Sequence, residues 1–145
     1  MKWQASASLV IAILVAGCVA PLPLTPADVQ ARKMEAPPAG MGVIYLVRPY
    51  PDHNGHPAPL SLGDTQMITT YPGTYYRWEV PPGRHQIIGA FADNGEIAVQ
   101  VEAGKTYYVQ QWTQPWLDYA KSFFQPVSQA QARAIISRGV LAGGG

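Results

Sequence analysis

Three short turns divide the middle of the chain into segments that each have the pattern of a β-strand. The turns are Pro-Pro-Gly at 81–83, Asp-Asn-Gly at 93–95 and Ala-Gly at 103–104. Glycine accepts the positive φ angles that such turns require. Between the last two turns, Ile97, Val99 and Val101 alternate with Glu96, Ala98, Gln100 and Glu102, as in a strand with one buried face. Closely spaced short strands of this kind predict an all-β fold, an antiparallel β-sandwich.

The segments on either side of these turns complete the expected domain, which spans 42–141. Residues 43–47 form an unbroken β-branched and aromatic run, which predicts a strand buried on both faces. Ser128-Gln129-Ala130-Gln131 matches a capping box and predicts a short C-terminal helix that reaches Arg138. Further strands are expected over 60–62, 66–68, 74–80, 85–91, 105–112 and 122–127, and residues 142–145 form the expected flexible tail.

Composition limits the possible functions. A chain of 145 residues is long enough for one domain with a hydrophobic core, and 48% hydrophobic residues argue against disorder. Ten Lys and Arg residues stand against nine Asp and Glu residues, and the arginines are scattered along the chain. Without a basic face to meet a phosphate backbone, we expect no nucleic-acid binding.

The first eighteen residues have the pattern of an export signal that ends in a cysteine. Lys2 precedes the apolar run 9–16, which is about half as long as a membrane-spanning helix. Val15-Ala16-Gly17-Cys18 resembles the lipobox of bacterial lipoproteins. The resemblance implies a signal peptide over 1–17, cleavage before Cys18, and acylation of that cysteine, which is the single cysteine of the chain. The alternative is an ordinary secretory signal with a chance cysteine.

The residues after Cys18 indicate how the domain is held. Val19, rather than Asp, follows the cysteine, which by the lipoprotein resemblance favours the outer membrane of a two-membrane bacterium. Residues 18–41 include five prolines and are expected to form a tether between the lipid anchor and the domain. Within the tether, Thr25-Pro26-Ala27-Asp28 has the pattern of a helix start. We therefore expect the domain to sit in the cell envelope, attached to a membrane by lipid.

Three segments together resemble an uncharacterised family of bacterial lipoproteins, designated only as a domain of unknown function with a β-sandwich fold. They are Gly42–Pro49, which matches the opening strand, Val80–His85, which matches a Pro-Gly turn, and Val101–Val109, which matches the closing hairpin. The similarity spans about 42–137. The resemblance implies a sandwich fold and no catalytic residues, since none are established for the family.

One loop, Asp52-His53-Asn54-Gly55-His56, carries residues that could bind a metal ion. Two histidines and an aspartate could supply three ligands for a metal-dependent hydrolase. No further ligand lies nearby in the sequence, and an Asn-Gly turn explains the same residues as a polar loop. We therefore expect no enzyme, no catalytic residues, no metal site and no cofactor.

Aromatic residues are the remaining candidates for function. Trp112, Trp116 and Tyr119 cluster near the end of the domain, and Trp116 is expected in a loop after Pro115. Aromatic rings bind sugars and peptides because their faces offer apolar area at low entropic cost. The alternative is that the rings fill the core. The leading hypothesis is a non-enzymatic, lipid-anchored binding or assembly module for another envelope protein, with a glycan-binding module as the rival.

Overall fold

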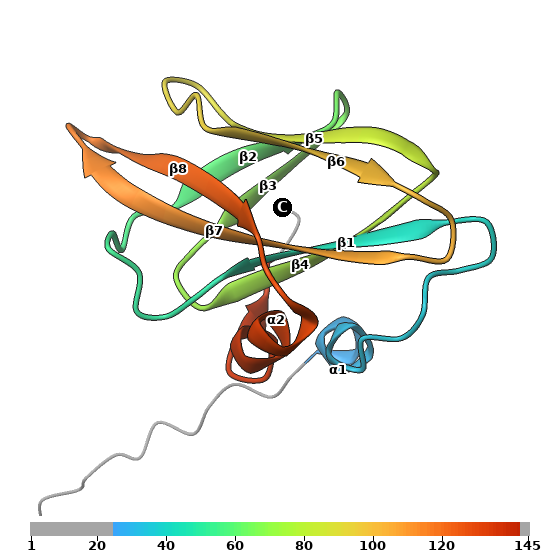
Figure 1. Cartoon of the computed structure of the whole chain (residues 1–145). Coiled ribbons are helices and arrows are strands. Elements are labelled where there is room, and N and C mark those ends of the chain that lie inside the picture. The colour runs from blue at the N-terminus through green and yellow to red at the C-terminus, as the bar shows by residue number, and fades with distance from the viewer. Residues whose placement is uncertain (1–24, 143–145) are drawn as a thin grey trace, which may run out of the picture.

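A computed structural model describes residues 25–142 as a β-sandwich with two short helices (Figure 1). The expected signal peptide, Cys18 and the glycines of the tail lie outside the described residues. Within the described range, no helix is both long and apolar enough to cross a membrane.

Two sheets form the sandwich. The first sheet holds, in spatial order, β8 (Tyr119–Pro126), β7 (Thr106–Trp116), β1 (Gly42–Arg48), β4 (Thr74–Val80) and β9 (Val140–Leu141). The second sheet holds β3 (Gln66–Thr70), β2 (Ala58–Leu62), β5 (Gly83–Gly89) and β6 (Glu96–Val101). The predicted all-β sandwich is confirmed.

Two strand pairs depart from the antiparallel pattern. β1 pairs in parallel with β7, and β4 pairs in parallel with β9. Hairpins force antiparallel pairing, whereas strands joined by a long connection are free to run in the same direction. The chain passes twice through the second sheet between β1 and β7, and α2 precedes β9. The sequence pattern of the hairpins could therefore not reveal these two pairings.

The main core lies between the two sheets. The alternation predicted for 96–102 is confirmed, because Val99 and Val101 are buried and Ile97 packs against the same cluster. Tyr76, Trp78 and Val80 of β4 also face this core, as their spacing predicts. The buried members are Ile44, Leu46, Leu60, Leu62, Ile68, Val80, Ile87, Val99, Val101 and Val109.

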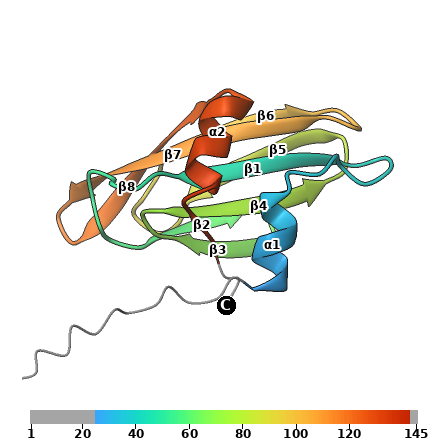
Figure 2. The same cartoon turned by 90° about the horizontal axis from the view of Figure 1, so that it is seen from below.

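A second apolar layer lies on the outer face of the first sheet, under helices α1 (Pro26–Arg32) and α2 (Gln129–Ile136) (Figure 2). Ala132 and Ile136 of α2 pack there against Val43 and Val47 of β1. This layer explains why every residue of β1 is buried, as its apolar run predicts. The Ser128 capping box of α2 is also confirmed.

The folded part of the chain extends beyond the expected boundaries at both ends. Thr25 caps α1 as predicted, but α1 packs on the sheet and does not hang free within the tether. Asp28 is buried, and its Oδ1 accepts hydrogen bonds from Tyr75 Oη (3.2 Å) and Leu141 N (2.7 Å). Burial, with the nearby Asp28 charge, raises the pKa of Tyr75 to about 12. Ala142, expected in the tail, is buried and donates to Tyr75 O (2.7 Å).

Candidate functional site

The candidate aromatic residues lie on one long hairpin formed by β7 and β8. Trp116 lies at the end of β7 and pairs with Tyr119, so its expected position in a loop is wrong. The strand continues through Pro115 because this residue lies near the hairpin end, where the lost N–H donor matters least. The two residues between Trp116 and Tyr119 make the turn, and Leu117 has a φ of 54°.

Strand alternation brings the three candidates onto the same face. Gln111, Thr113 and Ser122 of the hairpin point inward and are buried, so the residues between them point outward. Trp112 pairs with Phe123, and Trp116 pairs with Tyr119. We call the outward residues the hairpin face; they are Gln110, Trp112, Gln114, Trp116, Tyr119, Lys121, Phe123 and Gln125.

Ring contacts organise the hairpin face. The Trp112 and Phe123 rings stack with centroids 5.6 Å apart and an angle of 15° between their planes. Lys121 Nζ lies 5.7 Å from the Trp116 ring centroid and 5.9 Å from that of Phe123. These distances are within the range of cation–π attraction. Lys121 therefore links the two aromatic groups, and Trp116 keeps 55% of its surface exposed.

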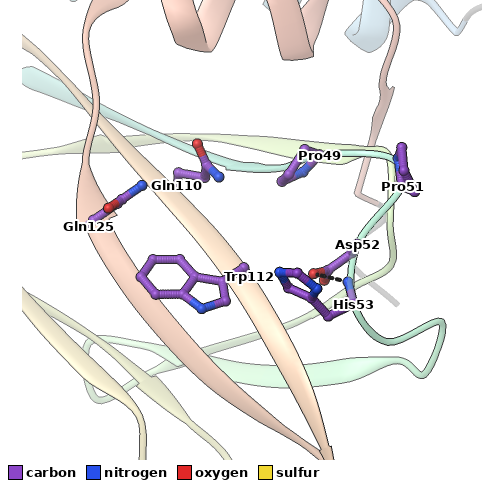
Figure 3. Close-up of a pocket in the computed structure, with 7 residues that line it drawn as sticks. All are labelled: Pro49, Pro51, Asp52, His53, Gln110, Trp112 and Gln125. Carbon is purple, nitrogen blue, oxygen red and sulfur yellow. Dashed lines mark hydrogen bonds between the residues drawn. The ribbon is translucent and has the colours of Figure 1, made fainter.

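A hollow of about 360 Å³ lies where the hairpin face meets the loop after β1 (Figure 3). Trp112, Gln110 and Gln125 come from the hairpin, and Pro49, Pro51, Asp52 and His53 come from the loop. The hollow thus combines an aromatic ring and an imidazole with two side-chain amides, which can both donate and accept hydrogen bonds. This combination suits an uncharged, hydroxyl-rich or amide-rich ligand.

A buried ion pair fixes the loop that borders the hollow. The Arg48 and Asp52 side chains are inaccessible or nearly so, and Arg48 Nε donates to Asp52 Oδ2 at 2.7 Å. Arg48 also donates to Asn54 O and Thr113 Oγ1, both at 2.8 Å, and to Thr70 O at 3.0 Å. Burial lowers the pKa of Arg48, against the opposing effect of Asp52. The pair therefore ties the loop to both sheets.

A second buried polar group supports the base of the hairpin. Gln111 Nε2 donates to Ser122 Oγ at 2.9 Å, and Thr70 Oγ1 donates to Gln111 Oε1 at 2.7 Å. Asp93 Oδ1 accepts from Ser122 N at 2.9 Å and from Gly95 N at 3.1 Å. Because buried polar groups need partners, these contacts hold β7 and β8 in one register over the second sheet.

The histidine loop does not assemble as the hydrolase alternative requires. Asp52 would be the third metal ligand, but both of its oxygens accept hydrogen bonds from protein donors. Oδ2 accepts from Arg48 and Thr113, and Oδ1 accepts from Thr113 N and His53 N. Within residues 25–142, no three His, Cys, Asp or Glu side chains are grouped as a metal site would need.

Sequence reasoning missed several residues of this site. Phe123 and Gln125 lie within the predicted strand 122–127, and extending its alternation back by one residue would have found Lys121. Nothing next to Arg48 in the sequence marks it as a residue of the site, since a buried arginine is rare and its acceptors come from distant segments.

Comparisons with known proteins add no further assignment: no family model, no curated protein and no solved structure matches the chain. The family resemblance of the three sequence segments therefore stays a prediction.

Proposed function

We propose that the protein is a non-enzymatic envelope lipoprotein, anchored through Cys18, whose sandwich binds an envelope partner through the hairpin face. The observation that carries this proposal is the convergence of Trp112, Trp116 and Tyr119 on one exposed face of one hairpin. A sandwich core needs its aromatic rings inside, whereas Trp116 presents more than half of its surface to solvent. Exposed tryptophans next to half-buried rings are typical of binding surfaces.

The buried carboxylates support a non-enzymatic role. Asp28 accepts a hydrogen bond from the capping residue Thr25 and holds β9, Asp52 pairs with Arg48, and Asp93 holds the base of the hairpin. Each of these side chains therefore has a structural role within the fold.

A glycan is the second candidate for the ligand, and the hollow beside Trp112 favours it. Sugar rings stack their C–H faces on aromatic side chains, while their hydroxyls pair with amides. Gln110 and Gln125 provide the amides beside Trp112. The same surface would serve a protein partner, so the two ligand classes must be separated by experiment.

Photocrosslinking in the native envelope tests the binding face. A photoreactive residue at Gln114, exposed in the centre of the hairpin face, should capture a defined partner. Gln100, exposed on β6 of the other sheet, is the matched control. Capture of the same species from both positions, or from neither, would contradict the proposed face.

A fluorescence measurement tests whether the ligand is a glycan. If the ligand is a glycan, fragments of peptidoglycan should change the tryptophan fluorescence, and Trp116→Ala should weaken their binding. No fluorescence change with any envelope glycan would leave a protein as the partner.

For the anchor, Cys18→Ser should abolish incorporation of labelled fatty acid, since serine lacks the thiol. Wild-type protein that takes up no label would contradict the lipoprotein assignment.

A further inference from the structure

A second exposed apolar surface, outside the hairpin face, lies between the end of β1 and helix α2. A hollow of about 630 Å³ occurs there, and Arg138 is the charged residue among those that line it. Tyr50 is 81% exposed, Val140 54% and the neighbouring Tyr71 50%. We call this surface the anchor-side patch; it consists of Tyr50, Tyr71, Pro72, Ile135, Arg138 and Val140.

Backbone contacts hold the patch together as one surface. Gly73 N donates to Arg48 O at 3.0 Å and to Pro49 O at 3.2 Å, so the 71–73 turn lies against the residues after β1. Val140 N donates to Gly73 O at 2.9 Å, which places β9 beside the same turn. The exposed apolar side chains are therefore displayed from three segments that are tied to one another.

Two further hydrogen bonds place the start of the described chain next to the patch. Thr25 Oγ1 donates to Asp28 Oδ2 at 3.1 Å, and Asp28 Oδ1 accepts from Leu141 N at 2.7 Å. Leu141 directly follows Val140 of the patch. Seven peptide steps separate Cys18 from Thr25. Even fully extended, they span at most about 25 Å. A lipid on Cys18 would therefore keep this side of the domain close to the bilayer.

We propose that the anchor-side patch lies on the lipid surface, so that the domain has a fixed orientation on its membrane. This inference rests on the proposed lipid anchor at Cys18. Tyrosines are enriched at the level of lipid headgroups because their rings are apolar and their hydroxyls are polar. Arg138 at the rim adds attraction to anionic lipids. A patch too small to bind a bilayer alone suffices once the lipid chains supply the anchoring.

Position-specific fluorescence on the lipidated full chain tests this proposal. Cys18 is the only cysteine, and acylation blocks its thiol, so one added cysteine gives one labelled site. Tyr71→Cys and Val140→Cys place an environment-sensitive dye on the patch. Ala103→Cys, exposed in the turn between β6 and β7, places it at the opposite end of β1. The vesicles contain phosphatidylethanolamine and phosphatidylglycerol, with and without a nitroxide in the headgroup region.

We expect nitroxide lipids to quench the dye at positions 71 and 140 at least about twice as strongly as at 103. Equal quenching at all three positions, on protein that floats with the vesicles, would overturn the docking and leave the anchor intact. A blue-shifted dye that nitroxide lipids do not quench would show a protein contact, and would also overturn docking on lipid. Protein that fails to float with the vesicles would overturn the anchor, and the docking with it.

Discussion

Replacing the buried arginine tests whether the Arg48–Asp52 pair holds the loop beside the candidate site. Arg48→Met keeps the length and apolar stem of the side chain but removes its charge and all its donors. Asp52 would then be left as a buried carboxylate facing a thioether, with Thr113 and the amide of His53 as its remaining donors. The bordering loop should loosen, and with it the hollow beside Trp112.

The expected cost follows from the burial of both partners. Both side chains are essentially inaccessible, and removing one partner of a buried pair typically costs about 3–5 kcal/mol, mostly because the other charge is left uncompensated. The lost bonds to Thr70 O and Asn54 O leave carbonyls that water can reach once the loop opens, so we expect about 4 kcal/mol. Against a typical stability of about 5–15 kcal/mol, the variant should still fold.

Urea unfolding of four proteins gives the test: wild type, Arg48→Met, Asp52→Asn and the double variant. The double variant should be at least about 1.5 kcal/mol more stable than the sum of the single losses predicts, because it no longer buries a lone charge. Arg84→Met, at an exposed position on β5, is the control and should change stability by less than about 0.5 kcal/mol. A loss below about 1.5 kcal/mol for Arg48→Met, or an additive cycle, would refute the reasoning.

Three other predictions concern the backbone, the pH dependence and the aromatic residues. Gly83 has a φ of +140° and open space around a Cβ, whereas Gly55 has the same open space without a positive φ. Gly83→Ala should thus lower the unfolding free energy by about 1–3 kcal/mol, and Gly55→Ala should not. Equal effects of the two substitutions in urea titrations would rule out backbone strain at position 83. Burial raises the pKa of Tyr75 to about 12, so the folded protein keeps this proton while the unfolded chain loses it above about pH 10. The free energy of unfolding should therefore fall by roughly 2–3 kcal/mol between about pH 10 and 12. In urea titrations Tyr75→Phe should lack this contribution, and the same pH dependence in wild type and variant would contradict the prediction. Trp78→Ala, half-buried against the core, should cost about 3 kcal/mol, and Trp116→Ala less than about 1 kcal/mol; calorimetric melting temperatures that drop equally would show that Trp116 is structural.

The sequence alone determined the strands whose patterns are local. Alternation over 96–101 gave the inward face of β6, and the apolar run 43–47 gave a strand buried on both sides. The capping residues Thr25 and Ser128 marked the starts of both helices. These signals succeed because side-chain periodicity and end capping depend on residues only a few positions apart.

Part of the candidate site could be predicted in the same way. Trp112, Trp116 and Tyr119 stood out as a cluster, and their common face follows from alternation once the strand reaches Trp116. That Lys121 and Phe123 lie opposite the β7 residues of this face follows only from the hairpin register, which the sequence pattern did not define.

Only the tertiary structure decided which distant segments meet. Arg48 finds acceptors in the loop after β1 and in strands β3 and β7, and Asp28 joins α1 to β9 across more than a hundred residues. The parallel pairing of β1 with β7, and the helices that cover β1, are equally non-local. Such contacts form because buried charges and apolar faces must find partners wherever the fold brings them, and no spacing along the chain records that requirement.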